Sequence, residues 1–373
     1  MSRPDYATLK RLVIKIGSSL LVDNEDSVNR EWLNSLADDV ASLRQNGHQV
    51  IIVSSGAVAI GGKVLGINRR RARLESLQAA AAAGQVRLVH AYQEALGRHG
   101  IAAAQVLLTP DDTEVKRRFL NARGTLEKLL DHNVVPVINE NDTVATDELR
   151  YGDNDRLAAR VAQTVMADLL VLLSDVDGLY TADPRQDANA GFLEVVDDVD
   201  ERHLSMAGDS ATDTGSGGMR TKLQAARIAT HAGCSTVIAS GRALHSLKLL
   251  FDGGRHTVFP AAGTPTSARK QWLAGMLEVG GSLVVDEGAV NALGNGKSLL
   301  PAGLTAVRGV FSRGDAVNIV DNNNLEIGRG LAAYSSEEAT AIKGCHSEQI
   351  EAILGYRGRS VLVHRDDMVL FRQ

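Results

Sequence analysis

The chain has few cysteines, no long apolar run and no excess of basic residues. Cys234 and Cys345 are its only cysteines and no CxxC pair occurs, so neither a disulfide framework nor a cysteine metal site is indicated. No apolar run approaches the roughly 20 residues of a membrane helix, and the first residues, MSRPDYATLKR, lack a signal-peptide core. A net charge of −5 gives no reason to expect nucleic acid or an anionic membrane as a bulk partner. We therefore expect a cytoplasmic protein.

The pattern of apolar runs indicates the fold class. At 373 residues the chain exceeds what one core usually fills, so two domains are expected. Short apolar runs alternate with helical patterns; the runs are 12–17, 50–56, 102–109, 134–142, 168–175 and 235–241, and the helices are 30–46, 74–98, 117–132, 155–166 and 220–232. Continuous apolar strands separated by helices predict an α/β fold, with an open, mostly parallel sheet between two layers of helices.

The character of the sequence changes after about residue 260. AAGTPTSARKQW is typical of a connection, and residues 280–360 carry the strand-like pieces SLVVD, SLLPAG, TAVRGVF, AVNIVD and SVLVH, broken by glycines. We expect an α/β domain over residues 1–262, a linker over 263–279 and a small, mainly β domain over 280–373.

Glycine turns and one lysine lie near the predicted strand ends, where open α/β sheets place their sites. Lys15 stands in an otherwise apolar strand, and burying an unpaired ammonium is costly, so we expect it to face the crevice; the alternative is a lysine that extends along an edge strand. In VSSGAVAIGG (53–62), backbone N–H groups and the hydroxyls of Ser54 and Ser55 could bind a polar ligand, although a turn without a ligand explains Gly56 equally well.

The stretch GSGGMRTKLQAA (215–226) combines three glycines, Lys222 and a helix start, which suits a phosphate. It matches neither GxxxxGK[ST] nor GxGxxG, and a flexible loop before an ordinary helix remains the alternative. Two acidic, asparagine-rich clusters, NEND (139–142) and GDND (152–155), suit a substrate ammonium or paired lysines, although helix capping would explain Asp153 or Asn154 alone.

Together these features favour phosphoryl transfer, whose catalysis is largely positioning and charge stabilisation. No metal-ligand spacing and no Ser/His/Asp order occurs in these motifs. A carboxylate acceptor would already be ionised at neutral pH and would need no general base.

Long blocks of the sequence resemble the glutamate 5-kinases of the amino-acid kinase family: KIGSSLL, SSGAVAIGG, FLNARGTLEKLLDHNVVPVINENDTVAT, YGDND, DVDGLYTADPR and GSGGMRTKLQAA. The C-terminal part, from SLVVDEGA to VHRDDM, resembles a PUA domain. The resemblance implies transfer of the ATP γ-phosphoryl group, with Mg²⁺, to the γ-carboxylate of L-glutamate, giving the L-glutamyl 5-phosphate of proline synthesis. It also implies a homo-oligomer, a dimer or a tetramer, and feedback inhibition by L-proline, with the loop Thr143–Tyr151 as the place to look for sensitivity.

The resemblance assigns roles by position. Lys15 and Lys222 would stabilise the moving phosphoryl group and Asp155 would organise them. The glutamate-binding positions are Ser55, Asp142 and Asn154, with Asn139 and Asp153 as neighbours. The nucleotide site comprises Lys15, Ser174, Asp175, Ser216, Gly217, Gly218, Met219, Arg220, Thr221 and Lys222. Serine stands at 174 and 216 where threonine is common, and both changes keep the hydroxyl.

Two alternatives are open. Other members of the family act on N-acetylglutamate, aspartate, carbamate or a nucleotide, but the NEND and GDND clusters suit a free ammonium, which an N-acetylated substrate lacks. An RNA-binding protein is the other, because PUA domains often accompany RNA-modifying enzymes. Residues 280–373 hold nine Lys and Arg against eleven Asp and Glu, so the basic excess that RNA binding uses is missing.

Overall fold

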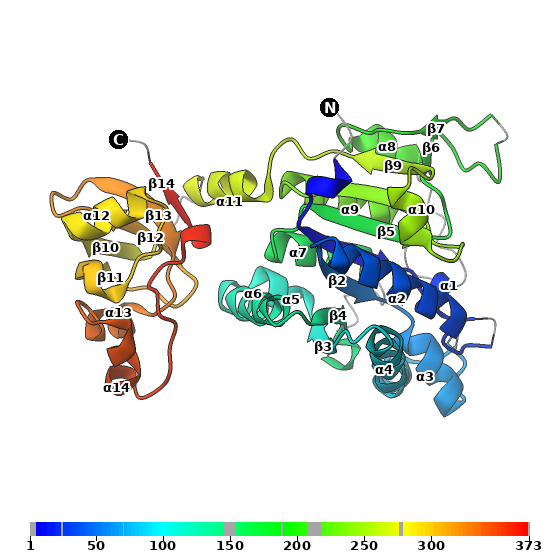
Figure 1. Cartoon of the computed structure of the whole chain (residues 1–373), viewed down its shortest axis with the longest axis horizontal. Coiled ribbons are helices and arrows are strands. Elements are labelled where there is room, and N and C mark those ends of the chain that lie inside the picture. The colour runs from blue at the N-terminus through cyan, green and yellow to red at the C-terminus, as the bar shows by residue number, and fades with distance from the viewer. Residues whose placement is uncertain are drawn as a thin grey trace. The chain divides into compact units, whose positions relative to one another are not determined.

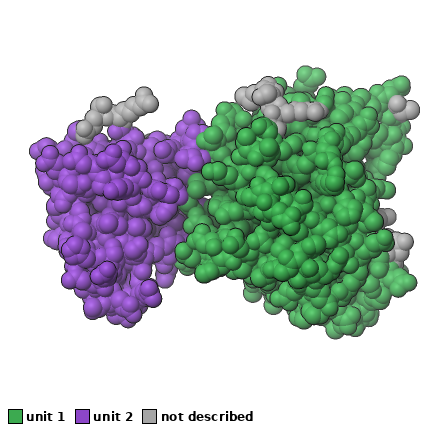
Figure 2. All heavy atoms as spheres, in the orientation of Figure 1, with its two compact units in different colours: residues 1–114, 121–265 green, residues 115–120, 266–373 purple. Residues whose placement is uncertain are grey.

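The computed structural model describes residues 5–23, 25–69, 71–144, 154–187, 189–206, 218–275 and 279–371. The chain forms two compact units, Met1–Glu114 with Asn121–Pro265, and Val115–Leu120 with Thr266–Gln373, which are coloured separately in Figure 2. None of the helices in the described ranges has the length and apolar character needed to cross a bilayer.

The first unit is built on a seven-stranded sheet in the order β3-β4-β2-β1-β5-β8-β9 (Figure 1). All neighbours pair in parallel except β8 and β9, which are antiparallel. The strands are β1 (Arg11–Ile16), β2 (Gln49–Ser54), β3 (Ala103–Leu108), β4 (Val135–Glu140), β5 (Leu169–Ser174), β8 (Ser235–Ser240) and β9 (His256–Phe259). The predicted α/β class and its six apolar strands are confirmed.

Helices cover both faces of this sheet because its strands are apolar on both sides. Leu12, Ile14 and Ile16 of β1 pack into one core with α2 and α4, while Val13 packs into a second core with α7 and α9. The helices are α1 (Ser18–Leu21), α2 (Arg30–Gln45), α3 (Ala57–Leu65), α4 (Leu74–Gly97), α5 (Pro110–Glu114), α6 (Lys116–Asp131), α7 (Asn154–Thr164), α8 (Glu201–Met206), α9 (Met219–His231) and α10 (Ser246–Phe251). Side chains alternate along a strand, so Lys15 lies on the face of Val13, toward α7 and α9.

The second unit contains a five-stranded sheet in the order β11-β10-β12-β13-β14, in which only β10 and β12 pair in parallel. Its elements are α11 (Pro265–Ala274), β10 (Gly281–Val285), α12 (Glu287–Gly294), β11 (Leu304–Gly309), β12 (Ala316–Val320), β13 (Glu326–Leu331), α13 (Ser336–Ala341), α14 (Ile350–Leu354) and β14 (Met368–Leu370). Helix α11 lies in the segment that we expected to be a linker.

Some elements differ from those expected from the sequence. SLLPAG and SVLVH contribute only an isolated bridge between Leu299 and Val363, because Pro301 begins a 3-10 turn that ends the first piece. The hairpin of β6 (Leu179–Tyr180) and β7 (Phe192–Leu193) was not foreseen, since two-residue strands are too short to show a period.

Candidate active site

Two buried lysines meet one buried aspartate at the carboxyl ends of the central strands. Asp155 lies in the first turn of α7, with Lys15 Nζ 2.6 Å from its Oδ1 and Lys222 Nζ 3.0 Å from its Oδ2. Thr221 donates its hydroxyl to the same Oδ2 at 2.8 Å. Lys15 and Lys222 are both 5% exposed and Asp155 is 1% exposed. The structure thus joins residues that are far apart in the sequence into one charged group with an excess positive charge.

The charges of this group set the ionisation of its carboxylate. Burial alone would raise the pKa of Asp155, but the two lysine charges outweigh it and hold that pKa well below its usual range. The N-terminal turn of α7 adds a further favourable potential for the anion. Asp155 is therefore a carboxylate throughout the physiological pH range, and it keeps both ammonium groups in place.

A chain of buried amides continues from Asp155 to the neighbouring strands. The Nδ2 atom of Asn154 lies 2.8 Å from the carbonyl oxygen of Ser54, 3.0 Å from Ser55 Oγ and 2.9 Å from Asn139 Oδ1. Asn139 in turn donates from Nδ2 to Oε1 of Gln85 on α4, at 2.8 Å. Three expected substrate residues, Ser55, Asn139 and Asn154, are thus brought together, and Gln85 joins them without having been predicted.

Asp142 lies just beyond β4, in the short 3-10 turn Asp142–Val144, and is 9% exposed. Burial and the neighbouring Glu140 raise the pKa of Asp142 to about 7. Helix α4, which carries Gln85, packs against this turn. A buried carboxyl group of this kind is a strong acceptor for a cation, because an ammonium would remove the cost of its ionisation.

A cavity of about 880 Å³ opens beside Lys222, at the ends of β5 and β8. Ser174, Asp175, Gly218, Met219 and Lys222, all expected at the nucleotide, line it. It is also lined by residues that were not predicted, among them Tyr180, Arg185, Met206, Ser240 and Arg242. Arg220 and Thr221 follow in the first turn of α9.

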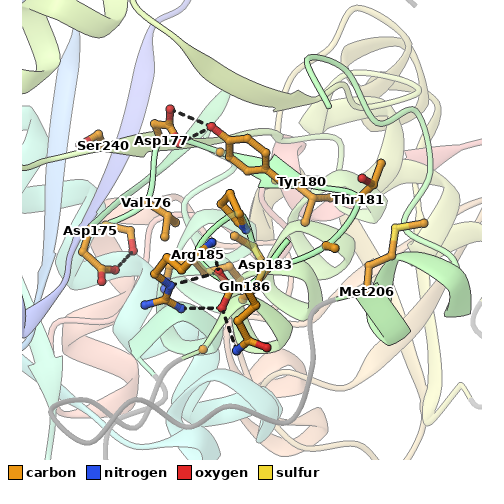
Figure 3. Close-up of a pocket in the computed structure, with 18 of the residues that line it drawn as sticks. Asp175, Val176, Asp177, Tyr180, Thr181, Asp183, Arg185, Gln186, Met206 and Ser240 are labelled. Carbon is orange, nitrogen blue, oxygen red and sulfur yellow. Dashed lines mark hydrogen bonds and ion pairs between the residues drawn. The ribbon is translucent and has the colours of Figure 1, made fainter. Parts of the chain in front are cut away.

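Residues 175–186 line much of the cavity, and ion pairs and hydrogen bonds among their own side chains hold them in place. Arg185 donates from Nε and Nη2 to the two carboxylate oxygens of Asp183, both at 3.0 Å, and Tyr180 donates to Asp177 at 3.0 Å (Figure 3). Besides Lys222, the cavity is lined by the ring of Tyr180, the thioether of Met206 and the guanidinium groups of Arg185 and Arg242, which pair with Asp183 and Asp175. This combination suits a nucleotide, with its flat base and its anionic phosphates.

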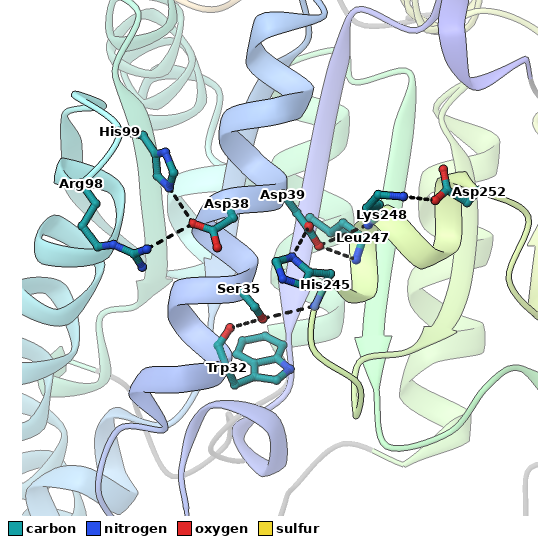
Figure 4. A network of polar contacts seen from close by, with 10 residues as sticks. All are labelled: Trp32, Ser35, Asp38, Asp39, Arg98, His99, His245, Leu247, Lys248 and Asp252. Atoms are coloured by element: carbon teal, nitrogen blue, oxygen red, sulfur yellow. Dashed lines mark hydrogen bonds and ion pairs between the residues drawn. The ribbon is translucent and has the colours of Figure 1, made fainter.

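A polar network on α2 holds the segment that follows β8 (Figure 4). Asp39, 4% exposed, accepts hydrogen bonds from the backbone N–H groups of Leu247 and Lys248 at 3.1 and 3.2 Å, and its Oδ1 lies 3.0 Å from His245 Nδ1. Trp32 donates from Nε1 to the carbonyl oxygen of Gly241 at 2.6 Å. Gly241 lies between the cavity-lining residues 240 and 242, so α2 fixes this edge of the cavity from behind.

Asp39→Ala is expected to destabilise the protein by about 2–3 kcal/mol, because it leaves the buried N–H of Leu247 and the partly buried N–H of Lys248 without their charged acceptor. It should also raise the KM for the nucleotide more than that for the acceptor, since the segment that follows β8 borders the cavity. Thermal unfolding and steady-state kinetics measure both. The control is Asp38→Ala, because Asp38 is the neighbouring residue on α2 and its side chain is 37% exposed. This variant should change the stability and the KM values little. Equal effects of the two variants would contradict this role for Asp39.

Three predicted site residues, Asp153, Ser216 and Gly217, lie outside the described residues, as do residues 145–151 of the loop expected to sense proline. Little in the sequence could have revealed Gln85, since it stands in an alanine-rich helix. Tyr180 and Arg185 do occur in the block DVDGLYTADPR that carried the resemblance.

Comparison with known proteins identifies the family. Residues 10–240 match the model of the amino acid kinase family, and residues 281–354 match that of the PUA domain. A glutamate 5-kinase of Paramagnetospirillum magneticum is 56% identical over 365 residues, covering 98% of this chain and 98% of that protein. A glutamate 5-kinase of Agrobacterium fabrum is 53% identical over 370 residues, covering 99% of this chain and 95% of that protein. The chain therefore belongs to the amino acid kinase family, in its glutamate 5-kinase group, and carries a PUA domain after the kinase segment.

Proposed function

We propose that this protein transfers the γ-phosphoryl group of ATP to the γ-carboxylate of L-glutamate, giving L-glutamyl 5-phosphate and ADP. The observation that carries the proposal is the buried group of Lys15, Asp155 and Lys222 between the large cavity and the amide cluster. Its two ammonium groups outnumber its one carboxylate, which suits a site for negative charge. The relatives at more than half identity support the same activity.

The chemistry follows from the charges. An oxygen of the acceptor carboxylate attacks the γ-phosphorus, and the bond from that phosphorus to the bridging oxygen breaks, so that ADP leaves with the electron pair. No proton has to move, because the acceptor is ionised at neutral pH. Lys15 and Lys222 neutralise the charge that spreads over the transferred oxygens, and Asp155 fixes their positions beforehand. Ser55, Asn139, Asp142 and Asn154 hold the acceptor, with Asp142 facing its ammonium.

A magnesium ion is expected to accompany ATP. In the described part of the chain no three His, Cys, Asp or Glu side chains group together as metal ligands, and Asp155 is already engaged by two lysines. These residues do not form a magnesium site by themselves. Mg²⁺ bound mainly by nucleotide phosphates would be consistent with this arrangement.

Hydroxylamine trapping tests the activity, because it converts an acyl phosphate to a hydroxamate. Purified protein with ATP and Mg²⁺ should yield hydroxamate from L-glutamate and little or none from N-acetyl-L-glutamate or L-aspartate. Preference for one of the latter would leave the kinase chemistry standing but refute the ammonium pocket. No hydroxamate from any of the three would refute the proposed function.

The KM for glutamate should depend on pH through Asp142. Because the pKa of Asp142 is raised to about 7 in the free protein, this carboxyl group is protonated below that pH and must lose its proton to bind an ammonium. We therefore expect the KM to be constant above pH 7 and to rise up to about tenfold per unit below it. Asp142→Asn should have a higher KM with no such rise. A wild-type KM that stays flat from roughly 1.5 pH units below neutrality to about one unit above it would contradict this assignment.

The resemblance supports three further parts of the proposal. The product would enter proline synthesis, and L-proline would inhibit by occupying the glutamate pocket, since it shares an ammonium and an α-carboxylate with glutamate. Millimolar proline should then raise the apparent KM for glutamate.

We also propose a homo-oligomer, with the kinase domain in residues 1–262 and the PUA-like domain in residues 280–373. Gel filtration with light scattering tests the oligomer.

A further inference from the structure

Gln85 is a buried residue of α4 with one satisfied and one unsatisfied end. Its side chain accepts a hydrogen bond at Oε1 from Asn139, while its Nε2 is buried and has no hydrogen-bond partner among the described residues. Gln85 is only 7% exposed. An amide nitrogen left in this state is costly, so its persistence at this place points to a partner that arrives with a ligand.

Its neighbours fix which way the amide faces. Three acceptors surround Asn154 Nδ2, so the oxygen of that amide must point the other way. Asn139 Oδ1 accepts from Asn154 and also from the backbone N–H of Glu140 at 2.9 Å, so its nitrogen must face Gln85. Turning any of these amides over would set like atoms against each other. The row of hydrogen-bonded amides Asn154–Asn139–Gln85 therefore has an unsatisfied group at each end. At one end is the donor Gln85 Nε2, and at the other is the acceptor Asn154 Oδ1, which is also buried without a partner in the described structure.

The order of the sheet places Gln85 at the end of the site that is remote from the nucleotide. The cavity lies at the ends of β5 and β8, Lys15 is on the next strand, β1, and Ser54 and Asn139 follow at the ends of β2 and β4. Gln85 lies beyond Asn139, on the helix that packs against the turn of Asp142. An acceptor whose reacting carboxylate meets the lysines would extend its other end toward Gln85.

We propose that Gln85 Nε2 donates a hydrogen bond to the α-carboxylate of the amino-acid substrate, while Asn154 Oδ1 accepts from its ammonium. Gln85 thereby selects an amino acid that carries a second carboxylate at the far end from the reaction. The inference rests on the proposed function and adds a specificity residue to it. A primary amide fits this role because its nitrogen can donate to the carboxylate while its oxygen still accepts the hydrogen bond from Asn139. The orientations of the three linked amides are then unchanged.

Gln85→Glu separates this role from a structural one. The variant keeps an oxygen for Asn139 and sets a negative oxygen where the donor was, opposite the substrate carboxylate. We expect the KM for L-glutamate to rise about tenfold or more, with the KM for ATP unchanged. Gln85→Met, which removes both the amide oxygen and the amide nitrogen, should also raise the KM for glutamate. Gln93→Glu, at an exposed position of the same helix, is the matched control and should behave as wild type.

L-Isoglutamine, in which the α-carboxylate is an amide, gives the decisive readout. Its amide can donate to the new carboxylate, so the ratio of kcat/KM for isoglutamine to that for glutamate should increase in Gln85→Glu. A residue that only supports the fold would lower both values together, and that result would overturn the inference. So would an unchanged KM for glutamate. Failure of the wild-type protein to make hydroxamate from glutamate would instead refute the proposed function itself, so the two failures are distinguishable.

Discussion

Lys222→Met is expected to lower kcat by about 10²–10³-fold, the usual effect of removing one preorganised group that stabilises transition-state charge. Methionine keeps the unbranched stem in its buried place and removes only the ammonium. The KM for glutamate should change little, because the acceptor residues belong to other elements. Initial rates of hydroxamate formation at saturating ATP and glutamate measure the effect.

The fold should survive Lys222→Met. Asp155 keeps Lys15 at 2.6 Å and the hydroxyl of Thr221 at 2.8 Å, so the carboxylate is not left alone and the protein should fold. The control for removing a lysine charge is Lys128→Met, because the Lys128 side chain on α6 is 76% exposed. This variant should retain wild-type rates. A Lys222→Met protein with wild-type kcat would refute the role of this lysine in phosphoryl transfer.

The sequence is informative where one residue contradicts its local environment. A lysine in the apolar run of β1 is costly to bury without a partner, so Lys15 is predictable as a site residue from the sequence alone. The role of Asp155 is predictable only through the family resemblance, because the cluster GDND leads into helix α7 and capping would explain part of it. The parallel sheet is predictable for a related reason, since strands covered on both faces lack the polar alternation of a surface strand. Such signals are local, because they can be interpreted from neighbouring residues and from the free-energy cost of burying a polar or charged group.

Residues whose role depends on distant partners cannot be predicted in this way. Asp39 stands in an amphipathic helix, where an acidic residue normally faces solvent, yet the structure buries it against the start of α10. Gln85 follows a run of alanines and has nothing beside it in sequence that needs an amide. Both roles arise only when α2 packs against α10 and α4 against β4, elements more than fifty residues away in the sequence, which no single stretch of sequence encodes.

Gly84→Ala is expected to destabilise the protein strongly, because it forces two closely packed helices apart. Helices α3 and α4 cross so closely that a Cβ at Gly84 would lie 1.9 Å from the carbonyl oxygen of Ala57, and one at Gly61 would lie 1.7 Å from that of Ala80. Backbone atoms on both sides cannot rotate away, so the helices must separate. We expect a loss of about 3 kcal/mol, which lowers the Tm by about 6–12 °C in a domain of this size.

The same helix supplies the control for this prediction. At Gly97 a Cβ would meet nothing within 4 Å, and alanine is favoured over glycine in a helix, so Gly97→Ala should keep or slightly raise the Tm. Equal Tm values for the two variants would show that α3 can move without cost. Because α3 begins directly after Ser55 and Gly56, its displacement should also disturb the acceptors of Asn154. Folded Gly84→Ala protein should therefore have a raised KM for glutamate as well, which ties the close helix crossing to the substrate pocket.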